Sequence, residues 1–297
     1  MMRTFRIGTR GSALALAQTE MVRSALARAV PGLVTEVVTI KTAGDILADA
    51  PLDAIGGKGV FVKDIERQLS QGHIDMAVHS LKDMQAILPH GLIIGACLTR
   101  EDPRDMLFSK GNYDLDTLPG GSSIGTSSMR RRCQIKMVRP DLKVMEIRGN
   151  VPTRLKKAGE NFDAVILAAA GVIRLGLPLG IAIDPQKMIP SPGQGIIAVE
   201  CRGMDNELKE MLGKLDHAPT RVCAEAERTF LAKLGQDCNL PAGALAVVNG
   251  EEISITGMLG SPDETTMARM SMKGKTPEVG RRLAMNLMEK IHGNGSA

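Results

Sequence analysis

Gly125–Arg154, with the sequence GTSSMRRRCQIKMVRPDLKVMEIRGNVPTR, is the stretch that decides the fold prediction. Ser128, at the end of a Thr-Ser-Ser run that follows a short apolar segment, is typical of a helix N-cap. Lys143–Ile147 then reads as a strand that passes through Arg148-Gly149-Asn150 into a second helix. Strands that alternate with helices predict an α/β fold with a parallel or mixed sheet.

The same stretch concentrates the positive charge of the chain. It holds eight of the 37 Lys+Arg residues but only two of the 33 acids, so the other residues carry 29 bases and 31 acids. Arg130, Arg131 and Arg132 would lie in the first turn of a helix, where the helix dipole favours negative charge. Arginines that fan out into solvent are one explanation. The alternative that we favour is an anion-binding cleft lined by this segment.

Outside this stretch the pattern continues in both directions. Phe5–Thr9, Thr35–Lys41 and Ile74–Val78 read as strands of a first lobe, and a second lobe begins near Thr99. A Pro/Gly-rich hinge at 189–195 returns the chain to the first lobe. A helix and alternating strands beyond residue 216 predict a small third domain. The expected boundaries are 1–98 plus 194–215 for domain 1, 99–193 for domain 2 and 216–297 for domain 3.

Composition excludes several classes of protein. The five cysteines are odd in number and form no C-x-x-C pair, which fits a reducing compartment. No histidine motif for a metal is present, and the longest apolar run has nine residues, too few to span a bilayer. The start of the chain lacks the apolar run of a signal peptide, so we expect a cytoplasmic protein without a metal or a membrane partner. With no Trp and one Tyr, stacking on nucleic-acid bases is disfavoured.

Two further turns are candidate binding sites on the residues alone. Arg10 and Ser12 lie in a strand-to-helix turn, where free backbone N–H groups favour an anion, although a lone Arg there is more often a solvated loop residue. Ser12 is the expected N-cap of the helix that follows. Ser80, Lys82 and Asp83 follow the third strand, at the edge where open α/β sheets bind ligands. Lys82 and Asp83 would point in opposite directions on an extended chain. The glycine-rich segment 55–59 is equally consistent with a lid and with a plain turn.

Eight stretches in order resemble the hydroxymethylbilane synthase (porphobilinogen deaminase) family. They are IGTRGSALALAQ (7–18), TAGDILADAPLDAIGGKGVFVKDIE (42–66), VHSLKD (78–83), GTSSMRRR (125–132), RGNVPTRL (148–155), ILAAAGVIRL (166–175), PSPGQGIIAVECR (190–202) and AERTFLAKLGQDCNLPAG (226–243). Each stretch alone is weak, but their succession over nearly the whole chain is specific.

The resemblance implies three domains, the first two similar to two-lobed type II periplasmic-binding-protein domains around a cleft and the third a small α+β domain with an antiparallel sheet. It implies an enzyme that joins four porphobilinogen molecules into hydroxymethylbilane and releases four ammonia, in tetrapyrrole biosynthesis. It also implies one covalent dipyrromethane cofactor per chain. We expect a monomer that does not bind nucleic acid.

Residue roles follow from the same resemblance. Asp83 matches the catalytic aspartate, Cys238 the cysteine that holds the cofactor through a thioether, and Lys58 and Phe61 the lid. Contacts to the acetate and propionate groups of cofactor and substrate are implied for Arg10, Ser12, Ser80, Lys82, Thr126, Ser128, Arg130, Arg131, Arg148, Arg154 and Arg174.

The chain departs from the family pattern at three places. Gln236-Asp237 replaces the small residues that usually precede the cysteine, Gln85 stands where a Pro is common, and Ala54 occupies a lid position that is often Lys. These changes put the paths of two loops and the composition of the lid in doubt, but they remove no residue with an implied chemical role.

Two other functions compete with the enzyme. A non-catalytic two-lobed binding protein for a small polyanion would explain the arginines, but it gives no use to Asp83, to Cys238 or to a third domain. A nucleic-acid-binding protein could use the basic helix start and would bind with a steep salt dependence, but the nearly neutral remainder of the chain argues against it.

Overall fold

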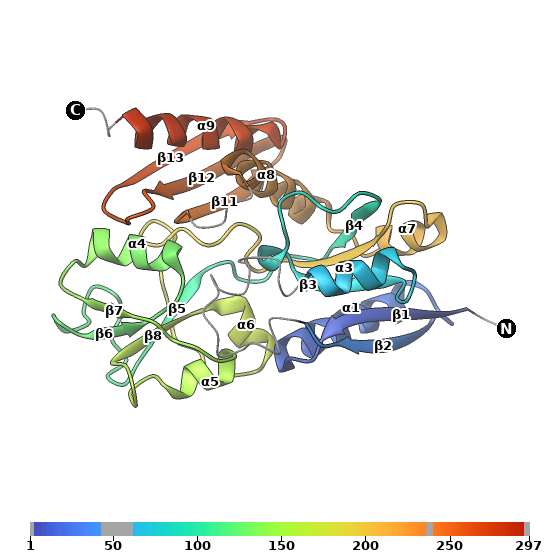
Figure 1. Cartoon of the computed structure of the whole chain (residues 1–297), viewed down its shortest axis with the longest axis horizontal. Helices are drawn as coiled ribbons and strands as arrows, with labels where there is room; N and C mark the ends of the chain where they lie inside the picture. Colours follow the sequence, from blue (N-terminus) through green and yellow to red (C-terminus); the bar gives the residue numbers. More distant parts are fainter. Residues whose placement is uncertain (1–2, 43–61, 236–239, 294–297) are drawn as a thin grey trace. The chain divides into compact units, whose positions relative to one another are not determined.

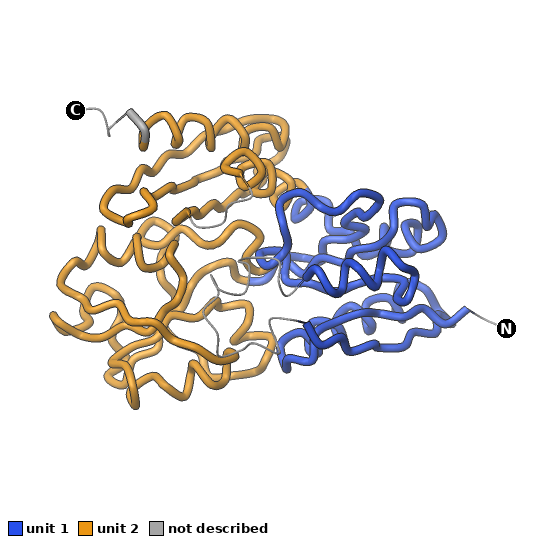
Figure 2. Tube along the Cα trace, viewed as in Figure 1, with its two compact units in different colours: residues 1–101, 196–221 blue, residues 102–195, 222–297 orange. Residues whose placement is uncertain are grey.

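The computed structural model describes residues 3–42, 62–235 and 240–293, and Figure 1 shows their secondary structure. The chain forms two compact units (Figure 2). Unit 1 comprises residues 1–101 and 196–221, and unit 2 comprises residues 102–195 and 222–297. The described residues form three sheets, one in unit 1 and two in unit 2.

Unit 1 is built on a five-stranded mixed sheet with the strand order β2-β1-β3-β10-β4. Strand β1 runs parallel to both β2 and β3, whereas β10 runs antiparallel to β3 and β4. The strands are β1 (Thr4–Arg10), β2 (Val34–Ile40), β3 (Met76–Ser80), β4 (Leu92–Cys97) and β10 (Ile197–Arg202). The helices are α1 (Ala13–Ala29), α3 (Lys63–Ser70), α7 (Asn206–Gly213) and the 3-10 turn η2 (Leu81–Asp83).

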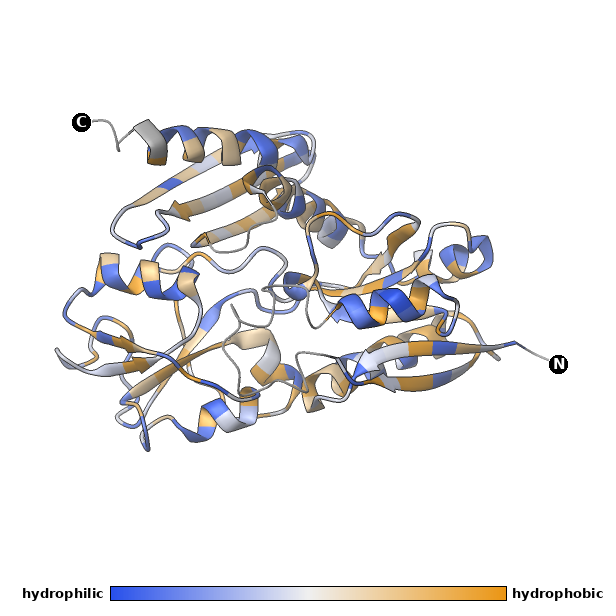
Figure 3. Ribbon diagram, in the orientation of Figure 1, coloured by the Kyte–Doolittle hydropathy of each residue, from blue (hydrophilic) through white to orange (hydrophobic). Residues whose placement is uncertain are grey.

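Helices cover this sheet because their apolar residues recur at helical spacing. Val22 and Leu26 lie one turn apart on α1 and are completely buried in one apolar cluster with strand residues of β1, β3 and β10. Ile65 and Leu69 on α3 repeat the spacing and are also completely buried, in a second cluster. In Figure 3 the charged residues of α3 stand out against the apolar strands. Each fully buried side chain of this kind contributes roughly 1.5–3 kcal/mol to folding.

Unit 2 contains a second five-stranded mixed sheet with the strand order β7-β6-β8-β5-β9. Strand β6 runs parallel to β7 and β8, and β5 runs antiparallel to β8 and β9. The strands are β5 (Asp105–Ser109), β6 (Ser123–Gly125), β7 (Lys143–Met145), β8 (Ala164–Ala168) and β9 (Ile181–Ala182). The helices are α4 (Met129–Val138), α5 (Val151–Lys156) and α6 (Ala169–Arg174).

Unit 2 also contains a three-stranded antiparallel sheet. It consists of β11 (Ala242–Asn249), β12 (Glu252–Gly260) and β13 (Met267–Gly274), and the helices α8 (Ala218–Leu234) and α9 (Glu278–Gly293) accompany it. Phe230 of α8 and Leu283 of α9 are completely buried in one cluster with the sheet. Glu227 of α8, itself buried, accepts hydrogen bonds from the backbone N–H groups of Gly193 (2.6 Å) and Ala246 (2.8 Å). One carboxylate thus joins the 189–195 segment to the third sheet.

The mixed α/β class and the small antiparallel sheet predicted from the sequence are confirmed. The predicted N-caps are confirmed as well, since Ser12 Oγ accepts from the N–H of Ala15 and Ser128 Oγ accepts from the N–H of Arg131. The second and third sheets belong to one compact unit. The three domain boundaries therefore stay a prediction.

Candidate active site

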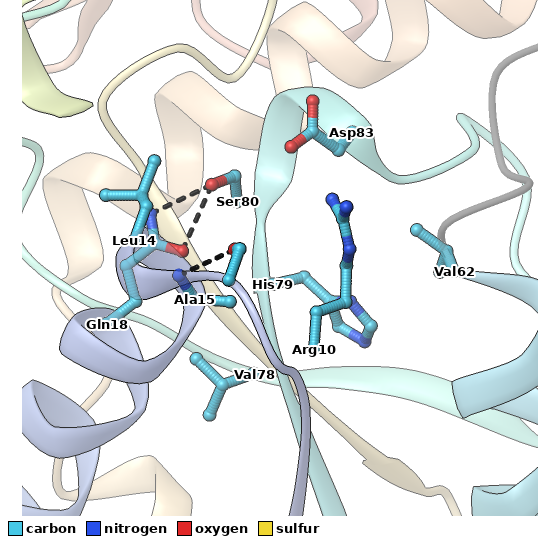
Figure 4. Close-up of a pocket in the computed structure, with 10 residues that line it drawn as sticks. Arg10, Leu14, Ala15, Gln18, Val62, Val78, His79, Ser80 and Asp83 are labelled. Carbon is cyan, nitrogen blue, oxygen red and sulfur yellow. Dashed lines mark hydrogen bonds between the residues drawn. The ribbon is translucent and has the colours of Figure 1, made fainter. Parts of the chain in front are cut away.

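Two strand-to-helix turns of unit 1 meet at one edge of its sheet. Because β1 and β3 are parallel neighbours, the residues that follow them, Arg10 to Ser12 and Ser80 to Asp83, emerge at the same edge. Arg10, Ser12, Ser80 and Asp83 line one pocket there (Figure 4). The structure thus brings together two pairs of side chains that lie more than 60 residues apart in the sequence.

The pocket is small. Its cavity volume is about 60 Å³. Asp83 is exposed at its rim, so its carboxylate is accessible to a ligand.

Gln18 is a pocket residue that the sequence analysis missed. Its Nε2 donates to Ser80 Oγ over 2.9 Å, and the hydroxyl lies 3.2 Å from Gln18 Oε1. The amide is almost completely buried on α1, in the turn after Leu14 and Ala15, which also line the pocket. A polar residue on the inward stripe of an Ala/Leu-rich helix is the signal that could have revealed it.

The segment of Lys82 and Asp83 differs from the prediction. Both residues lie in the 3-10 turn η2 rather than on an extended chain, since the N–H of Met84 bonds to the carbonyl of Leu81. Asp83 lines the pocket, and Lys82 is not among the lining residues.

A second group of candidate residues lies along one edge of the second sheet. Strands β7, β6 and β8 are parallel to one another, so the segments that follow them begin at the same edge. Thr126 and Ser128 follow β6, Arg148 follows β7, and Arg174 ends α6, which follows β8 directly. Arg148 precedes α5 and Arg154 lies within it, and Arg154 Nε donates to the carbonyl of Gly149 over 2.7 Å. Arg174 donates to the carbonyl of Gly195 over 2.6 Å.

Arg130 and Arg131 turn inward onto a buried carboxylate. Arg130 Nη1 lies 2.9 Å from Asp105 Oδ2 and Arg131 Nη2 lies 2.7 Å from Asp105 Oδ1. Asp105 is completely buried, and the two arginines are 6% and 7% exposed. Arg130 also donates to the carbonyl oxygen of Ile189, and Arg131 donates to that of Ile166. Two guanidinium groups and one carboxylate leave a local surplus of one positive charge.

The charges within this cluster shift one another's ionisation. Burial by itself raises the pKa of Asp105, but the opposing attraction of Arg130 and Arg131 outweighs it and holds that pKa well below the usual range. Burial lowers the pKa of Arg130, only partly opposed by Asp105. Arg131 Nε is buried without a hydrogen-bond partner among the residues described. The cluster therefore keeps positive charge and an unused donor in a dry environment.

The third arginine of the run has a separate partner. Arg132 Nε donates to Glu264 Oε1 over 2.6 Å, and Lys136 Nζ lies 2.7 Å from the other oxygen of the same carboxylate. Glu264 lies between β12 and β13 with φ +61°, a left-handed conformation that is rare for a residue other than glycine. The unfavourable cations at the start of α4 are thus compensated by two carboxylates of the chain itself, Asp105 and Glu264.

Some of the remaining predictions from the sequence concern positions outside the described residues. This holds for Cys238, Lys58 and Phe61. The other four cysteines are buried, as expected for small packed residues, and burial raises the pKa of both Cys133 and Cys201 to about 11. Within residues 3–42, 62–235 and 240–293, no cluster of three His, Cys, Asp or Glu side chains has the geometry of a metal site.

Family models match almost the entire chain. The model described as porphobilinogen deaminase, dipyromethane cofactor binding domain, matches residues 5–210, and that of the porphobilinogen deaminase C-terminal domain matches residues 221–289. The chain belongs to the porphobilinogen deaminase family. The family resemblance seen in the sequence motifs is therefore confirmed.

Curated members of the porphobilinogen deaminase family are similar over nearly their full length. The porphobilinogen deaminase of Roseiflexus sp. is 47% identical over 96% of this chain and 95% of its own. That of Acidithiobacillus ferrooxidans is 46% identical over 93% and 92%, and that of Bacillus subtilis 43% identical over 98% and 94%. Among solved structures, an ancestral cationic amino acid solute binding protein covers 76% of the chain and 93% of its own with a TM-score of 0.45 and 14% identity, too distant for a conclusion.

Proposed function

We propose that this protein is a hydroxymethylbilane synthase. It joins four porphobilinogen molecules head to tail, releases four ammonia and frees the linear tetrapyrrole, with a dipyrromethane primer held through Cys238. The observation that carries the proposal is the meeting of Arg10, Ser12, Ser80 and Asp83 in one pocket of a chain of this family.

The charges of the chain suit a substrate rich in carboxylates. Each pyrrole unit brings an acetate and a propionate, and guanidinium groups bind carboxylates in a planar, two-pronged manner. The buried surplus of one positive charge at Arg130 and Arg131, with the unused donor Arg131 Nε, fits a group of this kind. In our proposal the acid groups of cofactor and substrate are held by Arg10, Ser12, Ser80, Lys82, Thr126, Ser128, Arg130, Arg131, Arg148, Arg154 and Arg174.

Asp83 has the central chemical role in this proposal. The cofactor, when bound, supplies the free pyrrole α-carbon on which the product is built. Loss of ammonia from porphobilinogen generates a cation on the substrate, and the exposed carboxylate of Asp83 stabilises that charge as it develops. Gln18 fixes the hydroxyl of Ser80 with a buried amide and so keeps the wall of the pocket in place.

Turnover of porphobilinogen tests the function directly. We expect the purified protein to release ammonia and to form uroporphyrin after oxidation, whereas a polyanion-binding protein would only bind the substrate. Asp83→Asn should keep the fold and the cofactor mass but lower kcat by about 10²–10³-fold, as the removal of one stabilising group in a transition state does. Glu20→Gln on the outer face of α1 is the matched control. Near-normal turnover by Asp83→Asn would refute the role of Asp83.

We also propose that the protein acts as a cytoplasmic monomer with the lid residues Lys58 and Phe61 and the three domains delimited above. The helices that the structure describes include none with the length and apolar character to cross a membrane. Sedimentation at several concentrations tests the monomer, and limited proteolysis tests the boundaries near residues 98, 193 and 216.

A further inference from the structure

A histidine and a glutamate form a buried pair beneath the pocket of unit 1. His79 lies on β3 and Glu200 on the adjacent antiparallel strand β10. His79 Nε2 is 3.2 Å from Glu200 Oε2, with side-chain exposures of 4% and 0%. No hydrogen bond joins them, and neither Glu200 oxygen nor His79 Nε2 has a hydrogen-bond partner among the described residues.

This buried pair is not expected to stabilise the fold. It lies on the same face of the sheet as Ala77, which belongs to the apolar cluster of Ile65 and Leu69. Removing two ionisable groups from water costs several kcal/mol for each, and apolar replacements of such pairs are often neutral or stabilising. Ionisable groups that are buried at the wall of a pocket are instead frequent parts of functional sites.

One member of the pair reaches the candidate active site. His79 lines the same pocket as Arg10, Ser80 and Asp83 (Figure 4). Its Nε2 is next to Glu200, so Nδ1 is the ring nitrogen left for the pocket. A carboxylate 3.2 Å from Nε2 favours a proton on that nitrogen by electrostatic attraction, without the hydrogen bond of a hydrolytic triad, and leaves Nδ1 as the base.

We propose that His79 accepts the proton released at each condensation and that Glu200 positions its imidazole. This inference rests on the proposed function. In each cycle a carbon–carbon bond forms between the aminomethyl carbon of porphobilinogen and a pyrrole α-carbon, and the carbon–nitrogen bond to ammonia breaks. The α-carbon then gives up one proton as the ring regains aromaticity. His79 Nδ1 takes this proton and passes it to water before the next cycle.

Asp83 is the other group in the pocket that could take the proton, but its proposed role argues against it. A carboxylate that stabilises the cation of the next substrate has to keep its negative charge. If Asp83 were protonated at the end of each cycle, that charge would be lost. Two tasks with opposite requirements are better divided between two groups, and the pocket offers an exposed carboxylate in Asp83 and a buried imidazole in His79.

His79→Gln is the first test, with wild-type turnover as the reference. We expect kcat to fall by roughly 10²–10⁴-fold, the usual contribution of a general base, with KM close to that of the wild type. Porphobilinogen deuterated at its free α-position should show a larger isotope effect in the variant, because proton removal becomes slower. The exposed His90→Gln is the matched control and should behave as wild type. An unchanged kcat and isotope effect in His79→Gln would overturn the inference, whereas an inactive wild type would overturn the proposed function.

Glu200→Gln and a measurement without turnover complete the test. Nitrogen-15 NMR of histidine-labelled protein should place the His79 proton on Nε2 in the wild type and lose this preference in Glu200→Gln. The same variant should lower kcat even if His79→Gln does not fold. A wild-type His79 with its proton on Nδ1 only, or a Glu200→Gln enzyme with wild-type kcat, would refute the positioning role.

Discussion

Asp105→Asn is the substitution whose effect can be worked out most directly from the structure. The completely buried carboxylate lies between Arg130 and Arg131 at 2.9 and 2.7 Å, and Gln194 Nε2 donates to it over 2.9 Å. The amide keeps the shape but removes the charge, so two adjacent buried guanidinium groups lose their shared counterion. Breaking a buried pair by removing one partner costs about 3–5 kcal/mol. For a unit of this size, that corresponds to a fall in Tm of roughly 6–20 °C.

The stability that Asp105 contributes should depend on pH in one direction. The pKa of Asp105 is held well below its value in an unfolded chain, chiefly because the two arginines outweigh the cost of burial. The stability that the carboxylate contributes is therefore fully present above the unfolded pKa of about 3.9 and is lost as the pH falls toward the folded pKa. The difference in the free energy of unfolding between wild type and Asp105→Asn should stay constant from pH 8 to pH 5 and shrink only in stronger acid.

Urea unfolding followed by circular dichroism and fluorescence of a bound dye measures this difference at each pH. Asp116→Asn is the control, because Asp116 and its partner Lys187 are both exposed and their pair should contribute little. A surface salt bridge contributes up to about 1 kcal/mol. If Asp105→Asn lowered the free energy of unfolding by less than that, Asp105 would not be the counterion of Arg130 and Arg131.

Three further predictions concern other parts of the chain. Purified wild-type protein should exceed the sequence mass by two deaminated porphobilinogen units, and Cys238→Ala should lack that mass; an adduct retained in the variant would exclude this cysteine. Glu227→Gln should lower the free energy of unfolding by about 1–3 kcal/mol, because one of its two backbone N–H contacts then faces an amide donor, and wild-type stability in urea would contradict this. Cys133 and Cys201 should resist thiol reagents in the native protein at pH 8 and react on unfolding, since burial raises the pKa of both thiols to about 11; rapid native labelling would disprove their burial.

Local signals in the sequence were sufficient for much of the fold and for part of the site. Ser12 and Ser128 were recognised as N-caps because capping depends on a few adjacent residues, and both are confirmed. Asp105 had no such signal, since its partners lie 25 or more residues away and only the order of the strands brings them together. Gln18 and Ser80 are likewise paired across 62 positions of the sequence. The 3-10 turn at Lys82 was missed because short polar turns have little periodicity to detect.

Glu264 has a consequence for engineering this chain. Its carboxylate joins α4, which carries Arg130 to Arg132, to the turn between β12 and β13. These ion pairs link the parts of unit 2 that contain its two sheets. A chimaera that takes residues 240–293 from another protein would leave Arg132 and Lys136 facing foreign side chains. Such a graft needs an acid at the equivalent turn, and that one position is a better guide to compatible donors than identity over the whole segment.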